Sequence, residues 1–233
     1  MPVLVRFSNF AAVPGLPDGD PAASPRGMAI KFLLPDEVET DIVAHSYDGF
    51  PAATPEAFLA FLRALPDPAA LQALAAVSPA VRIFLDDPKP APASYATEAY
   101  FGVNAFRFSN AAGEARLGRY RILPLAGLRH LNAEQAAARP AHYLATELRD
   151  RLIRSDAAFR LQVQLAGPGD PTDDGTRPWP QDRRSPNSAP CPSRPLRSRG
   201  MPPGASSASF RPVSSPASPL RMTRCCWRGP RLI

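Results

Sequence analysis

The 233-residue sequence lacks the marks of several large protein classes. No apolar run reaches the roughly 18 residues that a membrane-spanning helix needs, and no charged segment followed by an apolar one opens the chain. HExxH, CxxC, Walker, GxSxG and usable GxGxxG patterns are also missing. We therefore expect no membrane span and no secretory signal, and residue spacing alone predicts no common metal, nucleotide or serine-hydrolase site.

Lysine and acidic residues are absent from the last part of the chain, residues 185–233. This tail holds ten prolines, ten serines and eight arginines, together with all three cysteines. Without the eight tail arginines, the 27 basic residues of the chain fall to 19, against 21 acidic residues. The net charge of +6 therefore belongs to the tail, and residues 1–184 give no electrostatic reason to expect a nucleic-acid partner.

Three interpretations of the tail compete. The first is a disordered basic arm that neutralises phosphates, and the second is a Pro/Ser-rich linker. The third is a polypeptide that results from translation of the DNA in the wrong reading frame. GC-rich DNA read out of frame yields Arg, Pro, Ser, Ala and Cys, which is the composition found here. We favour the third interpretation, so the chain divides into a body, residues 1–184, and a disordered tail, residues 185–233.

The body has the hydrophobic periodicity of an α+β domain. Alternating apolar residues predict strands at 3–10, 26–34, 40–46, 100–110, 115–124 and 158–166. Helical spacing predicts helices at 55–65, 68–77, 132–134 and 140–155. The first of these helices starts from Thr54-Pro55, a good N-cap followed by a proline that suits the first turn. Strands and helices show no βαβ rhythm, which favours an antiparallel sheet.

Few residues of the body stand out by type. His45 falls at the end of a predicted strand and is interpreted as a packed or surface histidine, while His130 and His142 fall in ordinary helical regions. Arg6 is unusual, because a charge between apolar neighbours in a strand either faces solvent or reaches an anionic ligand in a barrel mouth. Residue types alone thus support an α+β domain without a specific activity.

Five segments, in order along the body, resemble segments of the catalase family. They are VLVRFS at 3–8, DGDPAASPRGMAIKF at 18–32, TDIVAHSYDGFPAATPEAFLAFL at 40–62, the hairpin at 100–114, and the last strand at 159–165 with its Trp-Pro loop at 179–180. The resemblance covers residues 2 to about 184 and is closest to the small catalase-related peroxidases. Each motif is modest alone, but five in the family's order are a strong signal.

The resemblance implies a fold, a cofactor and a reaction. The family fold is an eight-stranded antiparallel β-barrel with flanking helices, which would be incomplete here. The family binds haem b through a tyrosine phenolate and uses a distal histidine as acid–base to break down hydrogen peroxide or organic peroxides. By resemblance we expect a peroxide substrate, and a homo-oligomer is one assembly that the chain could form. We expect a cytoplasmic location, or a periplasmic one if an upstream signal was lost.

Three residues match family positions of the haem site. Arg6 falls on the strand arginine that pairs with a haem propionate, since a guanidinium gives a carboxylate two parallel hydrogen bonds. Phe58 falls on the phenylalanine against the distal haem face, and Ser46 falls at the distal asparagine position, where its hydroxyl has a different reach. We expect a closed barrel in which Arg6 and Phe58 converge on one hollow, and we assign no metal ligand.

Two family residues have no counterpart in the sequence. The distal histidine lies upstream of the V-R-F-S strand in the family, and the proximal tyrosine lies in an R-x-x-x-Y motif that the tail lacks as written. A shifted reading frame of the tail permits family-like strings, including R-x-x-x-Y, so a frameshift after about Arg184 is expected. Two alternatives stay open: a catalytically dead family fragment with weak or no haem binding, and a nucleic-acid binder acting through the basic tail.

Overall fold

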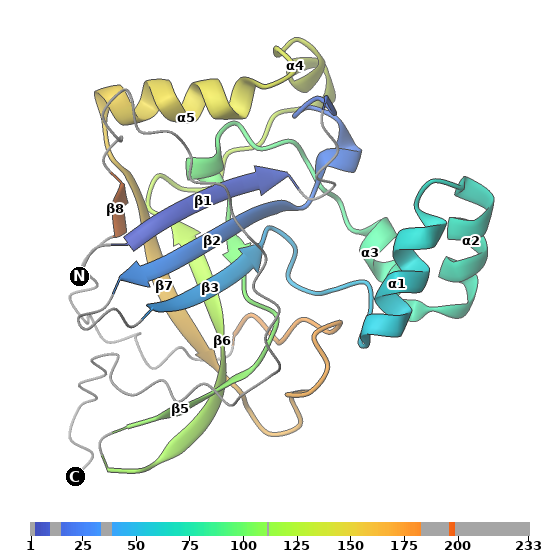
Figure 1. Ribbon diagram of the computed structural model, residues 1–233, viewed down its shortest axis with the longest axis vertical. Helices are drawn as coiled ribbons and strands as arrows, with labels where there is room; N and C mark the ends of the chain where they lie inside the picture. The colour runs from blue at the N-terminus through green and yellow to red at the C-terminus, as the bar shows by residue number, and fades with distance from the viewer. Residues whose placement is uncertain (1–2, 10–14, 34–38, 111, 183–195, 199–233) are drawn as a thin grey trace.

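The structure is a computed structural model, and it describes residues 3–9, 15–33, 39–110, 112–182 and 196–198. Eight strands form one antiparallel sheet in the order β1-β2-β3-β4-β6-β7-β8, with β5 paired to β6 (Figure 1). The strands are β1 Val3–Asn9, β2 Arg26–Leu33, β3 Glu39–His45, β4 Tyr100–Phe101, β5 Phe106–Ser109, β6 Ala115–Pro124, β7 Ala157–Leu165 and β8 Leu196–Ser198. The helices are η1 Pro21–Ala23, α1 Pro55–Ala64, α2 Pro68–Val77, α3 Pro79–Asp86, η3 Tyr95–Thr97, α4 Ala133–Ala137 and α5 Tyr143–Arg154.

The antiparallel α+β prediction is confirmed, but the closed barrel is wrong for the part of the chain that the structure describes. Strands β1 and β8 end the sheet order and do not pair with each other, so the sheet is open. Closure requires a continuous staggered ladder, whereas β3 and β4 share one residue pair, His45 with Phe101, and β8 has three residues. Strand β8 also lies within the predicted disordered tail, the rest of which is outside the described residues.

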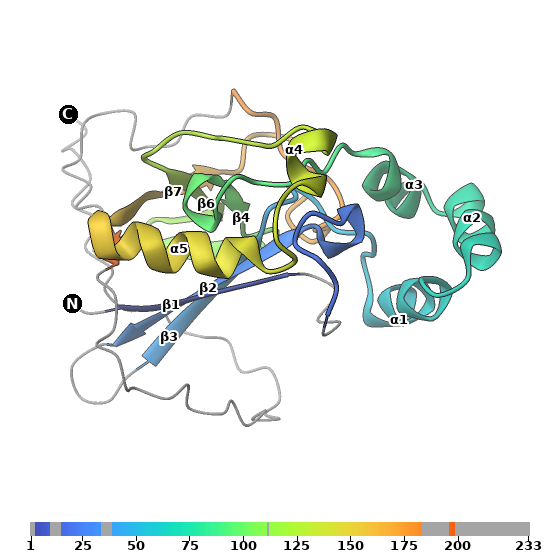
Figure 2. The same cartoon turned by 90° about the horizontal axis from the view of Figure 1, so that it is seen from above.

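The main core lies between the sheet and α5. Buried side chains from β2, β3, β6 and β7 meet here, including Ile30, Ile42, Ile122 and Phe159. Leucines of α5 pack on this cluster, and the helix runs across the same side of the sheet in two perpendicular views (Figures 1 and 2). The alternation of buried and partly exposed residues along β2 shows why this strand has one core face and one outer face.

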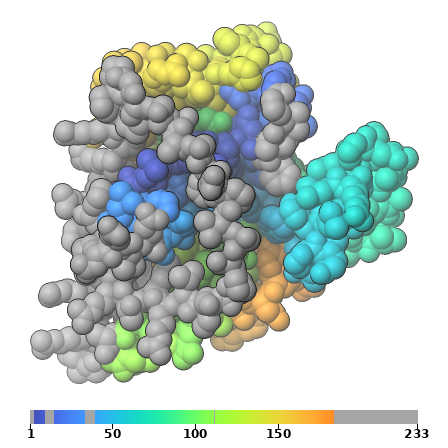
Figure 3. Space-filling model, viewed as in Figure 1, coloured from blue at the N-terminus to red at the C-terminus, as the bar shows by residue number. Residues whose placement is uncertain are grey.

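Helices α1, α2 and α3 form a separate lobe beside the sheet (Figure 3). Each begins with a capping residue followed by proline: the side chains of Thr54, Asp67 and Ser78 accept a backbone N–H in the first turn. The sequence predicted α1 and α2, and α3 was missed because its apolar stretch is short. Phe61 and Phe84 fill the lobe's own small core.

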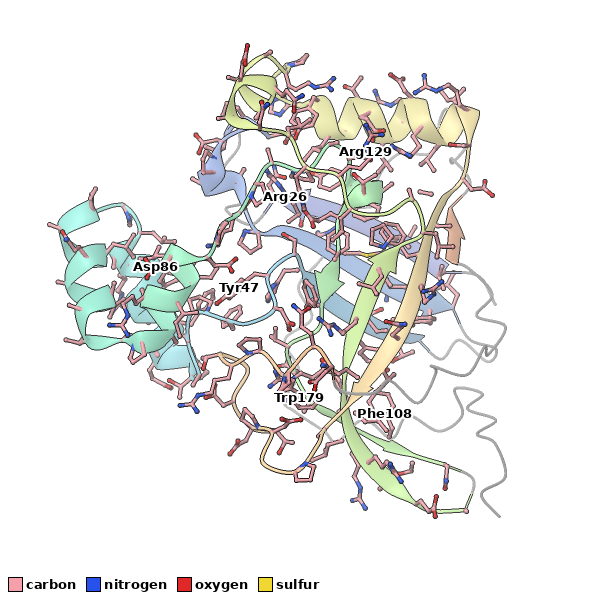
Figure 4. All side chains as sticks on the ribbon, turned by 180° about the vertical axis from the view of Figure 1, so that it is seen from behind. Arg26, Tyr47, Asp86, Phe108, Arg129 and Trp179 are labelled. Atoms are coloured by element: carbon pink, nitrogen blue, oxygen red, sulfur yellow. The ribbon has the colours of Figure 1, made fainter. Side chains whose placement is uncertain are left out.

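A buried arginine–tryptophan stack holds the loop that follows β7. The guanidinium of Arg119, on β6, lies 4.3 Å from the centre of the Trp179 ring and donates to the carbonyls of Pro171, Asp174 and Arg177. Trp179 is 1% exposed, and its Nε1 donates to the Pro171 carbonyl at 2.8 Å (Figure 4). The Trp-Pro motif of the sequence is therefore an anchor for this loop.

Candidate functional site

The side of β1, β2 and β3 that points away from the main core is a shallow floor. Side chains on a strand alternate between its two faces, and Val5 and Phe7 of β1 pack on the core. Arg6 between them therefore lies on the outer side, where it is exposed. Across the floor Arg6 is opposite Ala29 of β2, which is opposite Val43 of β3.

The next row of this floor is Ser8, Gly27 and His45, again one residue from each strand. A Cβ atom added at Gly27 would come within 2.6 Å of the Ser8 Oγ, so any larger residue here would have to displace the Ser8 hydroxyl. Strand β2 thus contributes only the small residues Gly27 and Ala29 to these two rows. The result is a low strip, bordered by Arg6 and Ser8 on one side and by larger residues of β3 on the other.

Among the residues that the structure describes, the floor carries two exposed aliphatic side chains beside the charged groups Arg6, Lys31 and Asp41. Val43 is 76% exposed and Leu4, on β1, is 56% exposed. Strand β2 lies between these two aliphatic side chains, and Ala29, its residue in the row of Val43, is small. A flat, largely apolar ligand with a carboxylate at its edge fits this arrangement, because Arg6 stands at the border of the strip.

His45 occupies the end of β3 beside a group of aromatic rings. Its ring lies 6.4 Å from the Tyr47 ring and 5.8 Å from the Phe50 ring, measured between centres. Both imidazole nitrogens are shielded from solvent, and neither has a hydrogen-bond partner. Burial lowers the pKa of His45 to about 4. The backbone of Tyr47 has a smaller effect that raises this pKa, although it is not placed to form a hydrogen bond with the imidazole. Apart from the position of His45 at a strand end, no sequence pattern predicted this environment.

Phe58 lies close to His45 through one intermediate ring. Its centre is 4.9 Å from that of Phe50, and it also contacts the core of the helical lobe through Phe61. The predicted place of Phe58 against the distal haem face stays a prediction. The structure thus brings Phe58 and His45 into one aromatic cluster, whereas Arg6 lies two strands away on the floor.

Ser46, the third predicted site residue, directly follows β3. Its hydroxyl accepts a hydrogen bond from the backbone N–H of Arg26 at 2.8 Å, and its own N–H donates to the Arg26 carbonyl. The hydroxyl therefore extends the pairing of β2 and β3. An accepting hydroxyl keeps its proton for a further bond, so the proposed role of Ser46 at the distal asparagine position stays a prediction.

A buried network fixes the strand ends next to the floor. Arg26 is 1% exposed and donates to the Asn9 Oδ1 at 2.7 Å and to the carbonyls of Asp18 and Ala23 (Figure 4). Tyr95 donates to the same Asn9 oxygen at 3.0 Å, and Asn9 in turn donates to the Asp18 carboxylate. The D-P-R-G segment that carried much of the resemblance is therefore a scaffold that holds β1 and β2 in register.

The hollows that the surface offers lie elsewhere. One of about 490 Å³ lies beside Arg129 and His130, and another of about 390 Å³ lies beside Asp48 and Trp179. Neither is lined by Arg6, Ser46 or Phe58. The convergence of Arg6 and Phe58 on one hollow therefore has no support from these cavities, and the open floor is the surface that carries Arg6.

The tyrosines of the chain are all in the core. The sequence has five, and each is described and at most 7% exposed: Tyr47, Tyr95, Tyr100, Tyr120 and Tyr143. Burial raises the pKa of Tyr47 and of Tyr95 to about 12, and it raises the pKa of Tyr100 and Tyr143 as well. These phenols are therefore kept protonated, which is the opposite of what a phenolate ligand to iron requires.

Neither a metal-binding cluster nor a helix able to span a bilayer is found among the described residues. No cluster of three or more histidine, cysteine or carboxylate side chains is placed to hold a metal ion in the described ranges. Within the same ranges, every helix is too short or too polar to cross a bilayer.

Comparison with known proteins matches the sequence to catalase-related peroxidases and to a catalase. The chain is 38% identical over 194 residues to the catalase-related peroxidase of Mycolicibacterium paratuberculosis, which covers 77% of this chain and 59% of that protein. It is 33% identical over 195 residues to the catalase-related peroxidase of Synechococcus elongatus, with 79% and 57% covered. Catalase isozyme 3 of Zea mays is 27% identical over 213 residues, with 78% and 40% covered. No family model matches the sequence.

Solved structures show the same fold. A fungal catalase aligns with a TM-score of 0.67 at 23% identity, covering 78% of this chain and 41% of the other. Catalase A of Saccharomyces cerevisiae aligns with a TM-score of 0.67 at 21% identity, covering 77% and 41%. The chain spans 59% and 57% of the two catalase-related peroxidases. These matches support a segment of the catalase family, one that carries rather more than half of the length of those relatives.

Proposed function

We propose that this chain carries the ligand-facing wall of a haem-dependent peroxidase or catalase that breaks down hydrogen peroxide or organic peroxides. The observation that supports this most is the outer face of β1–β3. That face combines the small residues Gly27 and Ala29 of β2, the exposed Val43 of β3, and the exposed guanidinium of Arg6 on β1. A haem has a flat apolar body and two edge carboxylates, so its shape and charge suit such a face.

The residues of the wall have separable tasks. Arg6 binds a propionate through charge-assisted hydrogen bonds. Val43 covers one face of the macrocycle, and Phe58 with its aromatic neighbours excludes water from the end of β3. Ser46 contributes a hydrogen bond at the distal asparagine position. Bound haem b would supply the redox chemistry of peroxide breakdown.

The buried tyrosines limit how this chain holds iron. Because all five phenols lie in the core, and burial raises the pKa of four of them, none of the five serves as the axial phenolate without unfolding its surroundings. We therefore propose that this chain binds haem through its propionate and stacking contacts, with weaker affinity than a tyrosine-ligated protein. A peroxide substrate, and assembly with further copies, belong to the same proposal.

The test is haem binding by the full chain, followed by absorbance in the Soret region. Arg6→Ala should weaken haem affinity about tenfold or more, since a hydrogen bond to a charged group contributes about 1.5–3 kcal/mol. Arg149→Ala, an exposed arginine on α5, is the matched control and should change nothing. Equal haem affinity for the wild type and Arg6→Ala would contradict the assignment of the wall.

Peroxide consumption is measured on the same samples. Haem binding with turnover supports the peroxidase proposal. Haem binding without turnover fits instead the alternative of a catalytically inactive segment. The nucleic-acid alternative depends on the arginines of residues 185–233, which are outside the described residues except for Leu196–Ser198.

A further inference from the structure

A hollow of about 490 Å³ lies beside α4, and its lining shares no residue with the floor. The side chains that line it are two guanidiniums, one imidazole, one amide and three small or aliphatic groups: Arg129, Arg139, His130, Gln135, Ala93, Leu131 and Ala138. Clefts of about 300–1,000 Å³ commonly hold small organic molecules. The charge and the rigidity of this lining therefore decide which class of molecule the hollow would take.

The backbone on which the hollow is built is fixed on two sides. On one side, the Ala93 N–H donates to the Arg129 carbonyl and the Leu131 N–H donates to the Ala91 carbonyl, each at 2.8 Å. These bonds join two segments that are distant in the sequence into a short antiparallel pair. On the other side, a capping box holds the first turn of α4. A ligand would therefore meet a site that is already formed, which lowers the entropic cost of binding.

The two arginines bring positive charge into the lining of the hollow. Neither Arg129 (Figure 4) nor Arg139 forms an ion pair with a carboxylate in the described part of the chain. Arg151 shows the contrast, because its guanidinium pairs with Glu147 at 2.8 Å. The Arg139 guanidinium lies instead over the Tyr143 ring, 5.9 Å from its centre. Both arginines are exposed, so an anion from solvent has access to them.

His130 is held in place by a buried carboxylate. Its Nε2 lies 3.1 Å from the Glu98 carboxylate, and Glu98 is 7% exposed. The other carboxylate oxygen of Glu98 accepts a hydrogen bond from the backbone N–H of Ala99 at 2.9 Å. The contact with Glu98 sets the orientation of the imidazole and leaves its Nδ1 for a ligand. An imidazole that is protonated on both nitrogens can donate to Glu98 and to a bound anion together.

We propose that this hollow is a binding site for a small phosphate monoester. A guanidinium offers parallel hydrogen bonds to phosphate oxygens, and two guanidiniums with an imidazole match the double charge and the several acceptors of this group. The Gln135 Oε1 accepts the Asn132 N–H, so the amide nitrogen of Gln135 remains a donor. Ala93, Leu131 and Ala138 would lie against the organic part of the ester. Because the hollow is separate from the floor, the inference does not rest on the proposed function.

The experiment titrates the full chain with phenyl phosphate, inorganic phosphate or acetate at constant ionic strength, because screening by salt changes the binding of anions. Affinity is measured by calorimetry, and the site is located by nitrogen NMR of the histidine side chains. The chain has three histidines, so His130→Gln identifies the His130 signal. The test variants are Arg129→Ala and Arg139→Ala. The matched control is Arg149→Ala, an exposed arginine of α5 that does not line the hollow.

Phenyl phosphate should bind to one site, shift the His130 signal, and bind more tightly than inorganic phosphate because its ring adds apolar contacts. Arg129→Ala and Arg139→Ala should each weaken the affinity about tenfold or more, since each removes hydrogen bonds to a charged group. Arg149→Ala should keep the wild-type affinity. Both test arginines are exposed and without an ion pair in the described residues, so their variants should unfold at the urea concentration of the wild type.

Three results would overturn the proposal. Equal affinity in all variants, or binding that leaves the His130 signal unchanged, means that charge elsewhere on the chain holds the anion. Acetate that binds as tightly as the phosphates overturns the choice of phosphate. Binding of inorganic phosphate without binding of phenyl phosphate overturns the assignment of a monoester.

Discussion

Protonation of His45 should destabilise the folded chain, and the substitution His45→Leu should abolish this pH-dependent loss of stability. The pKa of His45 is about 4 in the fold against 6.5 in the unfolded chain, and the cause is burial. A lowered pKa means that the unfolded state takes up the proton more readily. The stability that depends on neutral His45 is therefore fully present above about pH 6.5 and is lost as the pH falls toward 4.

The magnitude follows from the two pKa values. Complete protonation of a group whose pKa falls from 6.5 to about 4 costs about 3 kcal/mol of folding free energy, at about 1.4 kcal/mol for each pH unit. At pH 4.5 about 2.5 kcal/mol of this loss has occurred. That amount is a large fraction of the total stability of a domain, so it should be measurable by urea unfolding.

The assay compares unfolding free energies at pH 7 and pH 4.5 for the wild type and His45→Leu. The wild type should lose about 2.5 kcal/mol more than the variant between the two pH values. Other buried groups that titrate in this range, such as Glu98 and Asp48, are present in both proteins and cancel in the comparison. At pH 7 the variant should be at least as stable as the wild type, because it removes a buried group without partners.

An equal loss of stability in the two proteins would refute the reasoning, since it would mean that His45 is protonated equally in the folded and unfolded states. A marked loss in His45→Leu at pH 7 would show that the imidazole makes structural hydrogen bonds. His142→Ala should keep the full wild-type pH dependence, because this histidine is exposed in the fold.

Three further changes test the scaffold around the floor. Arg26→Met should destabilise the chain by about 3 kcal/mol or more in urea unfolding, because it leaves several buried acceptors without a donor; a loss under about 1 kcal/mol would contradict this. Gly27→Ala should cost about 1 kcal/mol in the same assay through its contact with Ser8, and most of that cost should vanish in a Ser8→Ala background. Trp179→Phe should cost about 1–2 kcal/mol in thermal unfolding, since it removes the bond to Pro171 and weakens the cation–π stack.

Local signals predicted most of the strands and helices. The Thr54-Pro55 pair predicted the start of α1 to the residue. The alternation in β1 predicted the strand but left open whether Arg6 faces solvent or a ligand. Helix α3 was missed, although Ser78-Pro79 repeats the same capping pattern. The predicted strand at 100–110 is interrupted between β4 and β5, a break that alternation alone does not show.

Contacts between residues that are far apart in the chain could not be predicted from local sequence patterns. Openness of the sheet depends on whether β1 and β8 pair, and no local pattern encodes that. The bond between Tyr95 and Asn9 joins residues 86 positions apart. His45 looked ordinary because its burial and its unmade hydrogen bonds arise only when the rings after β3 fold over it. Only part of the candidate site could therefore be predicted from the sequence. Arg6 was recognised from its charge, whereas the environment of His45 emerges only from the packing.

The placement of every tyrosine inside the core makes these side chains reporters of global unfolding. Four of them ionise less readily than a free phenol because burial raises their pKa. In an alkaline titration followed by ultraviolet absorbance, phenolate should therefore form late and together, as the core opens, and not one ring at a time. The same steep alkaline transition would mark the moment at which a phenolate first becomes accessible to iron anywhere in this chain.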